Sequence, residues 1–139
     1  MTVKKIDHIG IVVRDIESAL KVYRDALGLE LVKTEFVPEQ GVKIAFLPAG
    51  ESEIELVQPT ADDSGVARYL DRRGEGIHHL CLEVDDIEAA LAQAADQGMA
   101  LIDETPRIGS DGQKLAFVHP KSAHGVLIEF YEKPAGSNH

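Results

Sequence analysis

The chain has 139 residues, a length that is typical of one domain and sufficient to bury a substantial core. Its hydrophobic fraction is 44%, and no apolar run approaches the roughly 20 residues of a membrane-spanning helix, so we expect a soluble protein with no membrane partner. The net charge of −10 repels polyanions and argues against nucleic acid as a partner.

The N-terminal residues run directly into a strand-like pattern, without an apolar signal segment. The single cysteine, Cys81, has no partner for an internal disulfide, which agrees with a reducing compartment. Both features predict a cytoplasmic location.

Alternating apolar residues at Ile9, Ile11 and Val13 predict a half-buried first strand. Asp15 is a natural N-cap, and the periodic apolar residues behind it predict an amphipathic helix that stops at Gly28. Three short strands are then expected at about 29–37, 42–47 and 53–58, followed by a linking helix at about 66–73.

The rest of the chain repeats this order. Residues 6–20 align with residues 77–91 at a shift of 71 positions (79 − 8), which superposes His8 on His79. With a few residues of added loop before the last segment, the match also includes Gly41, Lys43, Ala45, Phe46 and Ile54-Glu55-Leu56, which align with Gly112, Lys114, Ala116, Phe117 and Ile128-Glu129-Phe130.

In this second copy Leu80, Leu82 and Val84 predict a strand, and Asp86 begins a helix that stops at Gly98. Strands should follow at about 100–104, 114–119 and 125–131.

Two tandem βαβββ modules of this kind resemble the vicinal oxygen chelate superfamily, over nearly the whole chain. The resemblance implies an α+β fold in which the modules form a curled mixed sheet around a metal-binding cup. We expect a single domain at about 1–133, with module one at about 1–65 and module two at about 75–133. Residues 134–139 are predicted to form a disordered tail.

Strand parity selects the side chains that face the cup. His8 and His79 lie on the strand faces opposite to the apolar residues that pack beneath the helices. Glu55 and Glu129 likewise alternate with apolar residues, and a buried carboxylate is costly unless it is paired or metal-bound. We therefore predict that His8, Glu55, His79 and Glu129 bind one divalent cation, since mixed imidazole and carboxylate ligands suit a first-row metal.

Other polar residues are expected to play structural or surface roles. They are His78 on the packed face, His119 and His124 near strand or loop ends, the buried thiol Cys81, and the solvated Lys43 and Lys114.

Three segments resemble the methylmalonyl-CoA epimerase family: Val37–Val42, Arg73–Leu80, and His119–Ser122 followed by Gly125–Glu129. The resemblance implies a coenzyme A thioester substrate and epimerisation of the carbon between its carboxylate and its thioester. It also implies a homodimer and cobalt as the metal, although Mn, Ni or Zn would suit the same ligands.

Epimerisation requires proton carriers on both faces of a planar enolate, whose negative charge a metal with open positions stabilises. The resemblance assigns one face to Glu129, as a ligand that is also the catalytic acid/base. Some members carry a second glutamate where this chain has Lys43 and Ile44. Glu39, Lys43 or a water therefore stay open for the other face, and charge alone suggests Lys121 and Arg73 for coenzyme A.

The same superfamily offers two alternative functions. A glyoxalase I type lactoylglutathione lyase uses the same set of two histidines and two glutamates. A non-catalytic small-molecule-binding member of the superfamily generally lacks the full set. Extradiol dioxygenases use two histidines and one glutamate around iron and fit less well.

Overall fold

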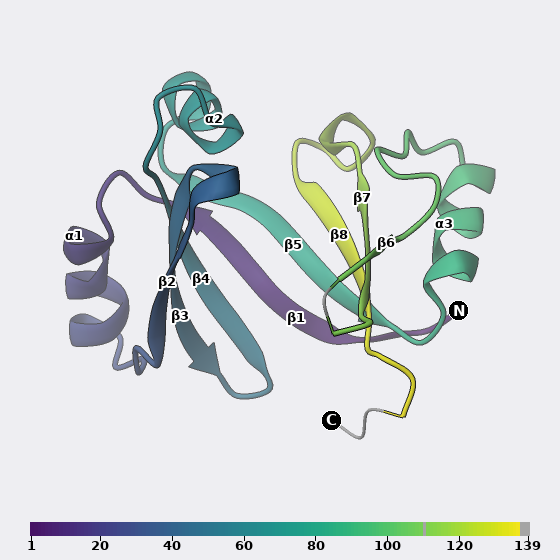
Figure 1. Ribbon diagram of the computed structural model, residues 1–139, viewed down its shortest axis with the longest axis horizontal. Helices are drawn as coiled ribbons and strands as arrows, with labels where there is room; N and C mark the ends of the chain where they lie inside the picture. Colours follow the sequence, from purple (N-terminus) through teal and green to yellow (C-terminus); the bar gives the residue numbers. More distant parts are fainter. Residues whose placement is uncertain (110, 137–139) are drawn as a thin grey trace. The chain divides into compact units, whose positions relative to one another are not determined.

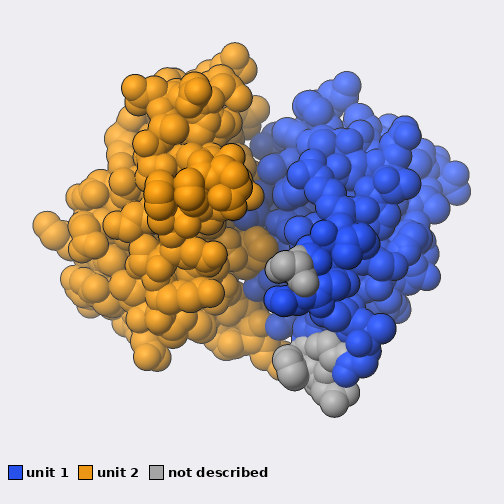
Figure 2. All heavy atoms as spheres, in the orientation of Figure 1, with its two compact units in different colours: residues 1–7, 79–139 blue, residues 8–78 orange. Residues whose placement is uncertain are grey.

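The computed structural model describes residues 1–109 and 111–136, and within them the chain has a mixed α+β fold with eight strands (Figure 1). The chain divides into two compact units, one of residues 8–78 and one of residues 1–7 and 79–139 (Figure 2). The two boundaries lie inside strands, at His8 and at His79. Each unit therefore contains one copy of the repeat and a piece of the other copy's first strand.

The unit of residues 8–78 contains the first copy. Its elements are β1 (Val3–Val12, in part), α1 (Ile16–Leu20), the π-helical turn η1 (Lys21–Ala26), β2 (Lys33–Val37), the 3-10 turn η2 (Pro38–Gln40), β3 (Val42–Ala49), β4 (Ser52–Pro59) and α2 (Gly65–Arg73). The strand order is β2-β3-β4-β1, with β1 parallel to β4 and the other neighbours antiparallel. This is the predicted βαβββ order, followed by the predicted linking helix.

The other unit contains the second copy. Its elements are β5 (Gly76–Val84, in part), α3 (Ile87–Asp96), β6 (Arg107–Ile108), β7 (Lys114–Val118), the 3-10 turn η3 (Pro120–Ser122) and β8 (Leu127–Glu132). The strand order is β5-β8-β7-β6, and β5 is parallel to β8. The start of β1 adds to this unit, because the Thr2 amide donates to a side-chain oxygen of Asp85 at 2.8 Å and the Asp85 amide donates to the Thr2 carbonyl at 3.2 Å.

The strand predicted at 100–104 is wrong. The described residues there form one isolated bridge, between Leu101 and Val118, and the two-residue β6 forms later. The Asp103 side chain accepts a hydrogen bond from the Phe117 amide at 2.9 Å, so it replaces a bond that a regular ladder would make.

The helical segments that begin with α1 and α3 start after the predicted aspartates and stop at the predicted glycines. The Asp15 side chain accepts from the Ser18 amide at 3.0 Å, and the Asp86 side chain accepts from the Ala89 amide at 3.1 Å. The first helix widens into a π-helical turn before Gly28, where the Leu27 amide donates to the Val22 carbonyl at 2.8 Å, five residues back.

Each helix packs on the apolar face of its own strands. The first cluster contains Val13, Ile16, Leu20, Ala45, Leu47 and Leu56, with Ile11 and Ile54 packed against it. The second contains Val84, Ile87, Ala90, Leu91, Ala116, Val118 and Phe130, with Leu82 and Ile128 packed against it. Since Ile54, Leu56, Ile128 and Phe130 point to the helices, strand alternation directs Glu55 and Glu129 to the opposite face, as predicted.

Among the described residues, no helix is long and apolar enough to span a membrane. At the C-terminus, Ala135 and Gly136 form an exposed turn, and residues 137–139 of the predicted tail lie outside the described residues. The single-domain boundaries and the disorder of the tail stay predictions.

Candidate metal and acid–base site

His8 and Glu55 form a pair within the unit of residues 8–78. The Nδ1 atom of His8 lies 3.5 Å from Oε2 of Glu55, and both side chains are 13% exposed. Parallel pairing of β1 with β4 sets this approach, because Gly10, two residues after His8 on the same face, is opposite Glu55. Gly10 has no side chain to fill the space in front of the pair.

His79 and Glu129 occupy the same positions in the other unit. Parallel pairing of β5 with β8 places Cys81, two residues after His79, opposite Glu129. The strand register of the first copy is therefore repeated residue for residue, although the two copies contain different loops. Glu129 is buried, at 7% exposure.

A phenylalanine flanks each glutamate on its other side. Phe46 pairs with Glu55 across β3 and β4, and Phe117 pairs with Glu129 across β7 and β8. Each carboxylate thus lies between a small residue on one neighbouring strand and an aromatic ring on the other.

The donors of the His8–Glu55 pair fit a shared cation. Two ligand atoms that bind one ion at about 2.1 Å are about 3.0–3.4 Å apart in octahedral or tetrahedral geometry. The observed 3.5 Å between nitrogen and oxygen is close to this range, and imidazole with carboxylate is a donor set for first-row divalent metals. These residues therefore fit the predicted metal.

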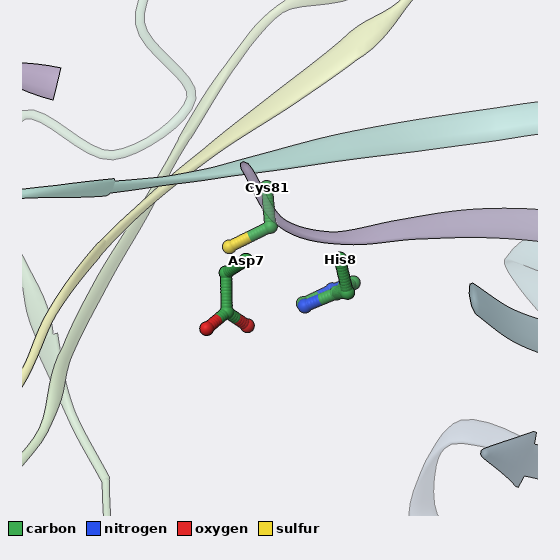
Figure 3. A group of neighbouring side chains, drawn as sticks. All are labelled: Asp7, His8 and Cys81. Carbon is green, nitrogen blue, oxygen red and sulfur yellow. The ribbon is translucent and has the colours of Figure 1, made fainter. Parts of the chain in front are cut away.

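The prediction omitted Asp7, whose carboxylate lies near the Cys81 thiol. A carboxylate oxygen of Asp7 and the Cys81 sulfur are within 4.8 Å of each other, and Figure 3 shows both side chains. Cys81 itself is fully buried, as predicted. Asp7 directly precedes His8, so the signal that could have identified it was adjacency to a predicted ligand.

The remaining histidines lie as predicted. His78 packs edge-on against the Tyr69 ring with centroids 4.7 Å apart, and burial lowers the pKa of its imidazole. His119 and His124 are exposed, and Nδ1 of His119 accepts a hydrogen bond from the Lys121 amide at 3.0 Å.

Lys43 lies on the helix side of its strand, on the face that carries Ala45 and Leu47. It pairs with Gln58, whose side chain accepts from the Ile16 amide at 2.8 Å at the start of α1. The positive charge of Lys43 also contributes to lowering the pKa of Asp15, after the dominant hydrogen bonds from Ser18. Glu55, by contrast, faces the other way.

Lys114 has the equivalent position and is an ion-pair partner rather than a solvated side chain. Its Nζ lies 3.0 Å from Glu88 and 4.0 Å from Glu132, and the hydrogen bond to Glu88 is the main cause of its raised pKa. Glu132 accepts from the Ile87 amide at 2.8 Å. Asp86 and Glu132 therefore accept hydrogen bonds from the first backbone amides of α3, and Glu88 in its first turn pairs with Lys114.

The fold of two βαβββ copies, each with a histidine and a glutamate at matching strand positions, agrees with the class of protein that the family comparison identifies. The chain belongs to the Glyoxalase/Bleomycin resistance protein/Dioxygenase superfamily, whose family model matches residues 7–117.

Within this superfamily the chain is similar to methylmalonyl-CoA epimerases. The structure of the enzyme from Mycobacterium tuberculosis is 41% identical, with a TM-score of 0.80 over 96% of this chain and 89% of that one. A single-substitution variant of the Streptomyces coelicolor enzyme, solved in complex with 2-nitronate-propionyl-CoA, is 35% identical, with a TM-score of 0.82 over 99% of both chains. An ethylmalonyl-CoA/methylmalonyl-CoA epimerase from Cereibacter sphaeroides is 35% identical over 90% of this chain and 95% of its own length.

Proposed function

We propose that this chain interconverts (R)- and (S)-methylmalonyl-CoA by removing and returning the α-proton. The observation that carries the proposal is the repeated strand register, which gives each copy a histidine and a glutamate at matching positions. The similarity to epimerases that act on this class of thioester supplies the substrate.

We further propose that His8, Glu55, His79 and Glu129 hold one divalent ion, with cobalt favoured by the family resemblance. The chain passes from one unit to the other at His8 and again at His79, so both histidines lie at the unit boundaries within β1 and β5. When bound, such an ion polarises the substrate oxygens and stabilises the negative charge that develops as the proton leaves.

Glu129 is the proton carrier for one face of the substrate. Its carboxylate accepts the α-proton, the electron pair of the C–H bond becomes the enolate, and a second carrier returns a proton to the opposite face. Since Lys43 faces the helix, Glu39 and a water are the candidates that stay open for that second carrier. Glu39 is exposed in η2, three residues before β3 begins at Val42.

The assembly is proposed to be a cytoplasmic homodimer, because two-fold association is the commonest closed symmetry and the family resemblance implies it. Sedimentation at micromolar concentration should show twice the monomer mass. A monomer alone would remove the dimer from the proposal and leave the site unaffected.

The function is tested by incubating the purified, metal-loaded chain with each pure methylmalonyl-CoA epimer in deuterated water. We expect NMR to show deuterium at the α-carbon together with formation of the other epimer. Exchange with a glutathione hemithioacetal and none with methylmalonyl-CoA would favour the glyoxalase I type lyase. Absence of both would favour a binding protein.

The metal is tested separately from turnover. The parent chain should retain about one divalent ion, and His79→Ala, which removes one ligand, should retain far less after dialysis against a weak chelator. His119→Ala is the matched control, since His119 is exposed and lies outside the proposed ligands. Equal metal content in His79→Ala and the parent would contradict the ligand assignment.

A further inference from the structure

An arginine lies on the same strand face as Glu129, at the edge of its sheet. Arg107 pairs with Leu115 across β6 and β7, and Leu115 pairs with Tyr131 across β7 and β8. Paired residues of antiparallel strands share a face. Tyr131 is two residues from Glu129, so Arg107 and Glu129 project from the same side of these strands.

Two contacts hold the Arg107 guanidinium in place. Its Nε donates to Oδ1 of Asp103 at 2.9 Å, and its Cζ lies 5.5 Å from the centroid of the Phe117 ring. The other oxygen of Asp103 accepts from the Phe117 amide at 2.9 Å, and the Asp103 side chain is only 12% exposed. Phe117 is the ring that flanks Glu129.

This arrangement leaves the outer edge of the guanidinium open. The Arg107 side chain is 60% exposed, and within residues 1–109 and 111–136 its two Nη atoms make no hydrogen bond. A guanidinium fixed at Nε and stacked on a ring presents its Nη donors in the geometry that a carboxylate or phosphate accepts bidentately. The net charge of −10 repels anions from the chain as a whole, so an anionic ligand needs a local cation such as the Arg107 guanidinium.

The other copy lacks an equivalent. Lys33 lies 4.7 Å from the centroid of the Phe46 ring, but its ammonium is ion-paired with the exposed Glu35 at 3.7 Å. Lysine is a flexible point charge without a planar fork, and its partner is itself 52% exposed.

We propose that Arg107 binds an anionic group of the substrate, a carboxylate or phosphate oxygen, and so positions the thioester beside Glu129. This inference rests on the proposed epimerase function. Arg107 is a binding and positioning residue, because it orients the substrate and exchanges no proton with it.

The test compares Arg107→Met with the parent and with Lys33→Met as the matched control. For methylmalonyl-CoA we expect Arg107→Met to raise KM about 10- to 100-fold, the value of one charge-assisted bidentate contact, with a smaller change in kcat. Arg107→Lys should recover only part of the loss, because it restores charge without the fork. Lys33→Met should leave KM within about twofold.

A second substrate distinguishes the two anions. Methylmalonyl-pantetheine keeps the acyl carboxylate and lacks the nucleotide phosphates. An increase in KM for both thioesters identifies the carboxylate as the group bound, and an increase for the coenzyme A ester alone identifies a phosphate. An unchanged KM for both in Arg107→Met would overturn the proposal.

Calorimetry separates this inference from the proposed function. Titration of coenzyme A into the parent and into Arg107→Met measures phosphate binding without turnover, and a phosphate contact predicts weaker binding to the variant and a loss of that difference at high salt. If the parent epimerises both thioesters while Arg107→Met matches it in KM and in coenzyme A affinity, only the Arg107 inference fails. If the parent epimerises neither thioester, the proposed function fails. Thermal unfolding of each variant verifies that the fold is retained.

Discussion

The two copies of the repeat agree in one row of side chains and differ in the next. The shared row consists of Gly10, Glu55 and Phe46 in the first copy and of Cys81, Glu129 and Phe117 in the second. The adjacent row consists of Val12, Val57 and Ile44 in the first copy and of Glu83, Tyr131 and Leu115 in the second. The row of proposed ligands is the repeated feature, and the row beside it distinguishes the copies.

The adjacent row is apolar in the first copy and contains a buried charge in the second, and this difference should affect the stability of the fold. Val12 and Val57 are buried apolar residues, at 0% and 4% exposure. Glu83 is also buried, at 3%, and its carboxylate lies 3.7 Å from Lys4 and 3.6 Å from Lys133. Its Oε1 atom has no hydrogen-bond partner among the described residues, so the desolvation cost is offset by charge attraction alone.

The largest expected effect tests whether the shared row is functionally symmetric. Glu129→Gln keeps an oxygen that coordinates weakly but cannot accept a proton at neutral pH. We expect turnover to fall about 10²- to 10⁴-fold, the usual contribution of an acid/base group, with metal retained. Glu55→Gln, the matched change in the other copy, should lower turnover less because Glu55 is proposed as a ligand only.

The measurement is deuterium uptake from each pure epimer, with metal content determined in parallel. If Glu129 serves one face only, Glu129→Gln should still exchange the α-proton of one epimer without inverting it. Near-parent interconversion by metal-loaded Glu129→Gln would make Glu129 a ligand only. Equal losses in both variants would make the two copies equivalent in the chemistry.

The next effect concerns the row that differs. Val12 is the first-copy counterpart of Glu83, so Val12→Glu buries a carboxylate at the matching position. The repeat offers it no lysine partners there, because the counterparts of Lys4 and Lys133 are Glu75 and Pro59 (4 + 71 = 75; 133 − 74 = 59). An uncompensated buried charge lowers the free energy of unfolding by about 3–5 kcal/mol. Glu83→Val should change it by less than about 2 kcal/mol, because a buried ion pair and an apolar replacement are often similar in stability.

Urea denaturation of both variants and the parent measures this difference, with the slope of each transition confirming that the unfolded states are alike. If Glu83→Val is as destabilising as Val12→Glu, the ion pairs of Glu83 with Lys4 and Lys133 contribute more than their geometry indicates. If neither variant is destabilised, the row is not a determinant of stability.

Periodicity and the internal repeat were enough to predict most of the fold. The internal repeat, with a shift of 71 for its first segments and of 74 for its last, identified most of the strands, the aspartate N-caps and the faces on which Glu55 and Glu129 lie, because each depends on local spacing. The failure at 100–104 has a non-local cause. The side chain of Asp103 binds the backbone of Phe117, which follows it by 14 residues, and no local pattern reveals that bond.

The same limit applies to the site. The pairing of His8 with Glu55 follows from strand parity and register, both of which the sequence encodes. Assigning Lys43 to the helix side required the cross-strand partner Gln58 and its bond to Ile16. Arg107 was also missed, since its position depends on a two-residue strand that no periodicity predicts.

The smallest expected effect tests the polar member of the differing row, Tyr131, which stands where the first copy has Val57. Burial raises the pKa of the Tyr131 phenol, and the negative charges of Asp7 and Glu83 raise it further. Because its folded-state pKa lies above the unfolded value of about 10, its contribution to stability is fully present below pH 10. That contribution is lost as the pH rises through the folded-state pKa.

Tyrosine absorbance near 295 nm follows this ionisation directly. In Tyr131→Phe we expect loss of a component that ionises above the ordinary range, and in Glu83→Gln we expect that component to move to lower pH, since one of the charges opposing ionisation is gone. A component lost near pH 10 in Tyr131→Phe would show that the phenol is well solvated. In that case Tyr131 would not act as a buried polar residue. Glu83 alone would then distinguish the adjacent row of the second copy from the apolar row of Val12, Val57 and Ile44 in the first.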